Sequence, residues 1–117
     1  MKKIKVLFMG RKSSGAEALS WLVSNGWEVV AVVTDEEQRG SPTARVARDL
    51  GLKLVNFIDL EKKLVQEELN FDLGLSYVFW RRLPSPLIDF PKLGFINFHP
   101  APLPDLKGTG GYNLAIL

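Results

Sequence analysis

The sequence predicts an α/β fold: a doubly wound, mostly parallel sheet of about five strands with helices on both faces. Two features of the chain predict this fold. Short apolar runs alternate along it with stretches in which apolar residues recur at helical spacing. The runs are nearly continuous rather than alternating, which is typical of strands buried on both faces. A chain of 117 residues is long enough for one domain with a substantial hydrophobic core.

The chain opens with an expected strand and helix. Residues 4–9 are almost all apolar, and Gly10 ends the run. Ser13 or Ser14 is then expected to N-cap a helix over residues 16–24, whose apolar side chains share one face. The opening apolar run is too short for a signal peptide, and no segment is apolar for long enough to span a membrane, so we expect a cytoplasmic protein.

A second buried strand completes the first strand–helix–strand unit. Asn25 and Gly26 form the turn, and residues 27–33 are apolar and rich in β-branched side chains. Such a unit is right-handed in nearly all known proteins. The polar residues 34–40 that follow are expected to form a loop.

The alternation continues to the end of the chain. Ser41 followed by Pro42 is a strong helix start, and Gly51 ends that helix. Further strands are expected at residues 53–57, 72–78 and 94–99, and further helices at residues 60–69 (closed by Asn70), 85–88 and 111–117. Strands and helices thus alternate throughout, as in a doubly wound sheet.

Composition excludes several classes of protein. Fifteen Lys and Arg against 13 Asp and Glu give a net charge of +2, which is too small for a typical nucleic-acid-binding surface. The chain has no Cys, which excludes a disulfide scaffold, a thiolate nucleophile and thiolate metal sites. Because there is a single His, a multi-histidine metal site is excluded as well.

Ligands of open α/β sheets bind beyond the carboxyl ends of the strands, so the loops there are candidate sites. Residues 10–15 (Gly-Arg-Lys-Ser-Ser-Gly) match neither the dinucleotide nor the Walker A pattern. Their cations and hydroxyls precede a helix N-terminus, which favours an anion, although a solvated turn with a serine cap is the better-supported explanation. The acidic residues 35–37 are interpreted as solvated loop charges.

The strongest candidate site lies at the end of the last predicted strand. Asn97 and His99 are two residues apart, so their side chains are expected on the same face, about 7 Å apart. Polar side chains in a buried strand cost free energy unless they are satisfied, so the two either form a structural pair or serve a ligand. The proline-rich residues 100–104 would form a stiff loop beside them.

At these residues the sequence resembles the folate-dependent formyltransferases. The signature is Asn-x-His-Pro at residues 97–100, followed by Pro-Leu-Pro at residues 102–104 and by Gly108. Comparable elements run through the whole chain, from the first strand to the Leu83-Pro84 stretch. The group includes glycinamide ribonucleotide, methionyl-tRNA and sugar N-formyltransferases.

The resemblance implies transfer of a formyl group from N10-formyltetrahydrofolate to an amine, a reaction of one-carbon metabolism. It identifies Asn97 and His99 with two of the family's three catalytic side chains, as donors to a tetrahedral oxyanion. The folate pocket would be formed partly by the main chain of the segment holding Val78, Phe79, Arg82, Leu83 and Pro84. The acceptor would be bound by Gly10, Arg11, Lys12, Ser13, Ser14 and Gly108.

The sequence departs from the family pattern in one major respect. The third catalytic residue is an Asp downstream of the motif, and Asp105 is too close to the motif to serve. We therefore expect residues 1–117 to be a single N-terminal catalytic domain, incomplete at its C-terminus and inactive as an isolated fragment. Residues 105–108 also lack the basic residue that several members carry there, and residues 110–113 are closer to the sugar formyltransferases than to the tRNA-specific ones.

The acceptor and the oligomeric state, a homodimer included, stay open. An amino sugar, glycinamide ribonucleotide or methionyl-tRNA would each supply an amine, and a tRNA would need a more basic surface than this chain carries. A non-catalytic folate- or nucleotide-binding module is the alternative function. A hydride-transferring oxidoreductase is disfavoured because Gly-x-Gly-x-x-Gly is missing after the first strand, with only Asp35 in its support.

Overall fold

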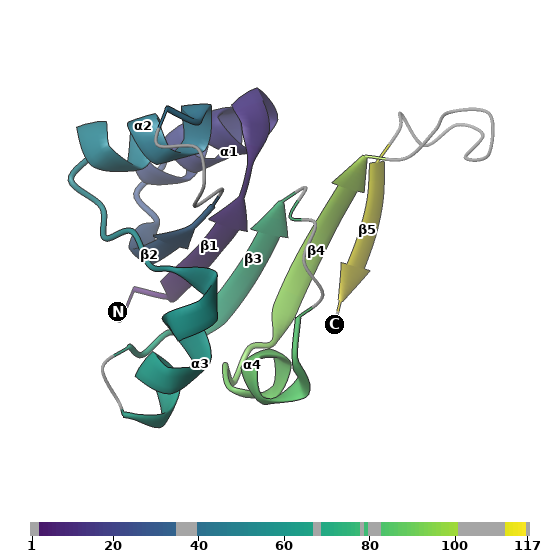
Figure 1. The fold of residues 1–117 in the computed structure, drawn as a ribbon. Helices are drawn as coiled ribbons and strands as arrows, with labels where there is room; N and C mark the ends of the chain where they lie inside the picture. The colour runs from purple at the N-terminus through teal and green to yellow at the C-terminus, as the bar shows by residue number, and fades with distance from the viewer. Residues whose placement is uncertain are drawn as a thin grey trace.

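The computed structural model describes residues 3–34, 40–66, 69–77, 79, 83–100 and 112–116. The helices and strands follow one another along the chain as in Figure 1. They are β1 (Lys5–Gly10), α1 (Lys12–Ser24), β2 (Glu28–Val33), α2 (Pro42–Asp49), α3 (Phe57–Val65), β3 (Leu73–Tyr77), α4 (Ser85–Asp89), β4 (Phe95–Pro100) and β5 (Tyr112–Ile116).

The strands form one sheet in the order β2-β1-β3-β4-β5. The pairs β1–β2, β1–β3 and β3–β4 are parallel, and β5 pairs antiparallel with β4. The chain runs from β1 outward to β2 and then returns to β3 on the other side of β1, so the direction of winding reverses between β1 and β3. This is the doubly wound arrangement that the sequence predicts, with four parallel strands.

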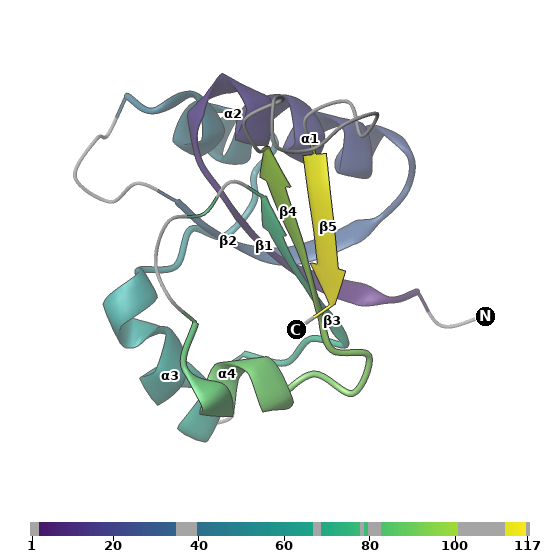
Figure 2. The same ribbon diagram turned by 90° about the vertical axis from the view of Figure 1, so that its right-hand side faces the viewer.

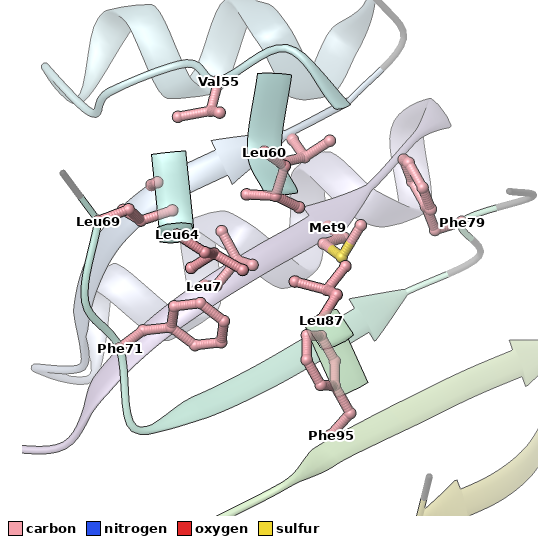
Figure 3. Close-up of a cluster of buried hydrophobic side chains, with 12 residues drawn as sticks. Leu7, Met9, Val55, Leu60, Leu64, Leu69, Phe71, Phe79, Leu87 and Phe95 are labelled. Atoms are coloured by element: carbon pink, nitrogen blue, oxygen red, sulfur yellow. The ribbon is translucent and has the colours of Figure 1, made fainter. Parts of the chain in front are cut away.

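Helices cover both faces of the sheet, as predicted. Figure 2 shows α1 and α2 together on one side and α3 and α4 on the other. Under α3 and α4 lies a core that includes Leu7, Met9, Leu60, Leu87 and Phe95, most of which Figure 3 shows in close contact. The opposite core, under α1 and α2, contains the alternate residues of the same strands, such as Val6 and Phe8 of β1.

The alternation of side chains along each strand therefore defines two faces. Phe95 of β4 belongs to the α3/α4 face, and Phe98 of the same strand packs on the α1/α2 face. Gly74 of β3 shows how tightly the α3/α4 face is packed, because a Cβ atom there would overlap the ring of Phe95. Only glycine fits at that position without moving the ring.

Local caps fix the beginnings of α2 and α3. The backbone N–H of Ala44 donates to Oγ of Ser41 at 3.2 Å, so the predicted Ser41 cap with Pro42 behind it is confirmed. At α3, the N–H of Ile58 donates to Oδ1 of Asn56 at 2.8 Å. Both helices start where a side-chain oxygen satisfies one of their free N–H groups.

Three predicted boundaries are wrong. Because α1 already begins at Lys12, with Arg11 at the N-cap and no side-chain cap, neither Ser13 nor Ser14 caps it. Asn56 caps α3, which therefore begins at Phe57 and leaves no room for the strand predicted over residues 53–57. In place of that strand there is a single bridge between Val32 and Leu54. Since α3 ends at Val65 with Gln66 as its C-cap, Asn70 does not close it.

The helix predicted for residues 111–117 is also wrong where the structure describes it. Residues Tyr112–Ile116 form β5, paired with β4 from Ile96 to Pro100. The outer edge of β4 offers backbone hydrogen bonds to a neighbouring segment, and such long-range pairing overrides a local helical pattern.

Within the described ranges, no helix is both long enough and apolar enough to cross a membrane.

Candidate functional site

The carboxyl ends of the four parallel strands meet along one edge of the sheet. The strands end there at Gly10, Val33, Tyr77 and Pro100. Their register is continuous across the three inner strands, with Met9 of β1 opposite Ser76 of β3, and Ser76 opposite Asn97 of β4. Any residue near this edge therefore has a defined neighbour on the next strand.

Asn97 is the third and His99 the fifth residue of the six-residue strand β4. They alternate with Phe98, which belongs to the α1/α2 face, so their backbone positions belong to the α3/α4 face. Asn97 is half-buried. The backbone of His99 is described, opposite Asn113 of β5, and its imidazole lies outside the described atoms.

The loop after β1 is held to α2 by a partly buried hydrogen bond. Thr43, which is fully buried, donates from Oγ1 to the carbonyl oxygen of Lys12 at 3.0 Å. Lys12 has φ = 65°, the left-handed region that residues other than glycine rarely adopt. A Cβ on Gly15 would lie 3.0 Å from the same Oγ1, so glycine suits this close approach of α1 to α2.

This loop leaves an uncapped helix terminus beside two cations. Arg11, at the N-cap of α1, makes no side-chain cap hydrogen bond to the first N–H groups of the helix. Lys12 and Ser13 are exposed, and Arg11 and Ser14 are half-buried. Such a terminus, with positive side chains around it, is chemically suited to an anionic group.

The segment expected to hold the folate runs from the end of β3 to the start of α4. Phe79 is buried and packs against Phe57 of α3, with ring centroids 5.4 Å apart. Leu83 is half-buried against the same core, and Pro84 is the N-cap of α4. Of the remaining predicted binding residues, Val78, Arg82 and Gly108 lie outside the described residues.

Sequence reasoning missed a hollow on the opposite face of β3 and β4. It is a cavity of about 380 Å³ whose lining includes Trp21, Trp27, Tyr77 and Phe98. Its lining side chains are apolar or aromatic, so it offers no charge or amide for chemistry. The signal that could have found it is the pair of tryptophans flanking the end of α1, both of which are exposed.

Comparison with known proteins gives consistent matches. The formyl transferase family model matches residues 2–117. The methionyl-tRNA formyltransferase of Syntrophus aciditrophicus is 32% identical over 133 residues, covering 100% of this chain and 41% of that protein. The one from Geobacillus sp. is 33% identical over 125 residues, covering 97% and 39%. The chain thus spans about two fifths of the length of these relatives.

Solved structures share the fold. The phosphoribosylglycinamide formyltransferase from Anaplasma phagocytophilum superposes with a TM-score of 0.68 at 19% identity, covering 99% of this chain and 65% of that one. The enzyme from Bacillus halodurans gives a TM-score of 0.66 at 19% identity, covering 92% and 61%. Identities this low establish the likeness of fold alone.

Proposed function

Since the chain belongs to the formyl transferase family, we propose that it forms the N-terminal catalytic part of an enzyme that moves a formyl group from N10-formyltetrahydrofolate to an amine. One observation carries the proposal. Asn97 and His99 occupy the same face of β4 at the carboxyl edge of the parallel sheet, where such folds bind their substrates.

The two side chains suit the charge that develops in this reaction. The amine nitrogen attacks the formyl carbon, and the carbonyl oxygen becomes an oxyanion in a tetrahedral intermediate. An N–H of the Asn97 carboxamide and an N–H of the His99 imidazole are donors for that oxygen. The bond from carbon to N10 then breaks, and the proton lost by the amine is returned to N10. An imidazole can carry this proton near neutral pH.

The described residues fit a folate that is recognised through the main chain. The ring of Phe79 packs into the core against Phe57, so a folate in this segment would be recognised through main-chain groups rather than through this ring. Leu83 and Pro84 continue the same wall, and β3, which leads into it, is the neighbour of β4 in the sheet. We assign the folate to this segment together with Val78 and Arg82.

We assign the amine acceptor to the loop after β1. Arg11 and Lys12 bring positive charge to the uncapped start of α1, and the Thr43 bond fixes the path of the backbone there. The chemistry favours an acceptor that carries an anionic group, such as a phosphate. Gly10, Ser13, Ser14 and Gly108 complete the proposed acceptor site.

Replacing Asn97 or His99 by alanine in the full-length protein tests the proposal. Each change should lower kcat for formyl transfer from N10-formyltetrahydrofolate by about 10²-fold or more, the usual loss for one oxyanion donor. Circular dichroism should remain unchanged in both variants. Near-normal turnover in both would contradict the catalytic assignment, and folate binding without turnover in the unmodified protein would favour a binding module.

A further inference from the structure

Few polar side chains are buried in the described part of the chain, and Ser76 stands apart among them. The buried polar residues there are Thr34, Ser41, Thr43 and Ser76. Ser41 caps α2, and Thr43 binds the carbonyl of Lys12, so both have a structural hydrogen bond. Among the described residues, Oγ1 of Thr34 is buried without a hydrogen-bond partner, but Thr34 follows β2, which β1 and β3 separate from β4. Ser76 is 2% exposed and lies within an inner strand, where a hydroxyl costs free energy unless it serves a partner.

The neighbour of Ser76 on the next strand is the candidate oxyanion donor. Ser76 and Asn97 are direct partners in the parallel ladder of β3 and β4, so their side chains stand side by side on one face. On its other side, Ser76 has the buried thioether residue Met9 as its partner on β1. Two residues earlier on the same face, the ring of Phe95 covers Gly74.

The side chains in the same row of the sheet as Asn97 are apolar, apart from the hydroxyl of its neighbour Ser76 on β3. Met9, Leu87 and Phe95, which Figure 3 shows gathered on this face, are apolar and fully buried or nearly so. A carboxamide has a donor end and an acceptor end, and an oxyanion requires the donor end. A hydroxyl that donates to the amide oxygen selects this orientation, which an apolar neighbour cannot do.

Building on the proposed function, we propose that Ser76 is a positioning residue for Asn97. Within the described residues no hydrogen bond joins the two side chains, so the pairing requires the Asn97 side chain to rotate. The Ser76 hydroxyl then donates to Oδ1 of Asn97, and the Nδ2 hydrogens face the carbonyl oxygen of the formyl group. Ser76 itself touches neither substrate.

Kinetics of four variants of the full-length protein test this role. Ser76→Ala should lower kcat about tenfold, a part of the 10²- to 10³-fold that loss of an oxyanion donor costs. Its KM for N10-formyltetrahydrofolate should stay within about twofold of the unmodified value, because the folate is held elsewhere. Ser76→Thr, which keeps the hydroxyl, should recover most of the rate. The double variant Ser76→Ala/Asn97→Ala should be no slower than Asn97→Ala.

Controls separate this role from a structural one. Thr34→Val removes another buried hydroxyl, at the end of a strand separated from β4 by two others, and should leave kcat within about twofold. If Ser76→Ala folds poorly, the kcat values of Ser76→Thr and Ser76→Val can be compared instead. These two side chains have the same shape, and a methyl group in Val replaces the hydroxyl of Thr.

An unchanged kcat in Ser76→Ala, or a double variant whose loss is the product of the single losses, would overturn the inference while the proposed function stands. Near-normal turnover in both Asn97→Ala and His99→Ala would instead contradict the proposed function, and the role of Ser76 with it.

Discussion

The two faces of β3 and β4 differ in what they present, although the same two strands build them. On the α1/α2 face, Tyr77 and Phe98 stack with ring centroids 5.7 Å apart and line an apolar cavity. On the α3/α4 face, Ser76 and Asn97 stand in the same register one residue away. The period of two along a strand therefore places aromatic side chains on one face and polar side chains on the other, within a single pair of strands.

The difference extends to how well each face is packed. Phe95 is completely buried under α3 and α4, and its ring fills the space above Gly74. Phe98, three residues later, is half-buried beside a hollow. A densely packed face holds its side chains in fixed positions, which a catalytic constellation requires.

The largest expected effect on stability comes from removing a buried ring from the α3/α4 face. Phe95→Ala should lower the free energy of unfolding by about 3–5 kcal/mol, because a fully buried ring is lost and a cavity remains. Phe98→Ala is the matched control on the same strand and should cost about 1–2 kcal/mol. Urea denaturation followed by circular dichroism measures both values. Equal losses would show that the two faces are packed alike.

Adding a methyl group to the tightly packed α3/α4 face should have the next largest effect on stability. Gly74→Ala places a methyl group inside the ring of Phe95, so strand or ring must shift, at a cost of about 1–3 kcal/mol. Gly40→Ala is the control, since a Cβ there meets no atom within 4 Å, and its effect should stay within about 0.5 kcal/mol. Thermal unfolding compares the two. A Gly74→Ala variant as stable as the unmodified protein would contradict the close packing of Phe95 on β3.

The smallest effect is expected on the apolar face. Trp21 is 59% exposed at the rim of the cavity, so Trp21→Ala should change the free energy of unfolding by about 1 kcal/mol or less. The same variant should keep kcat for formyl transfer within about twofold, in contrast to Asn97→Ala. Steady-state kinetics on the full-length protein checks this. A large loss of kcat in Trp21→Ala would place part of the chemistry on the α1/α2 face.

Local signals predicted most of the parallel sheet. The continuous apolar runs before Gly10 and around Val32 identified buried strands, and Ser41-Pro42 identified the start of α2, because each signal lies within a few residues. Signals that depend on distant partners failed. The bridge at Leu54 and the pairing of β5 with β4 depend on neighbours that the local pattern does not contain.

The part of the candidate site that lies on a single strand, β4, could be predicted from the sequence. Alternation alone put Asn97 and His99 on a common face, and the backbone of β4 agrees. Ser76 was not identified, because a single serine in an apolar run means little until the register brings it opposite Asn97. The cavity was missed for the same reason, since its lining comes from α1, β1, β3 and β4 together.

The bond from Thr43 to Lys12 joins segments 31 residues apart in the sequence and has a consequence for recognition. It ties the left-handed backbone of Lys12 to α2, so the shape of the loop after β1 depends on the packing of α2 against α1. A ligand that binds at this edge therefore meets a backbone shape that is already formed. Selection between ligands there depends on how well each one fits that shape, rather than on a rearrangement of the loop.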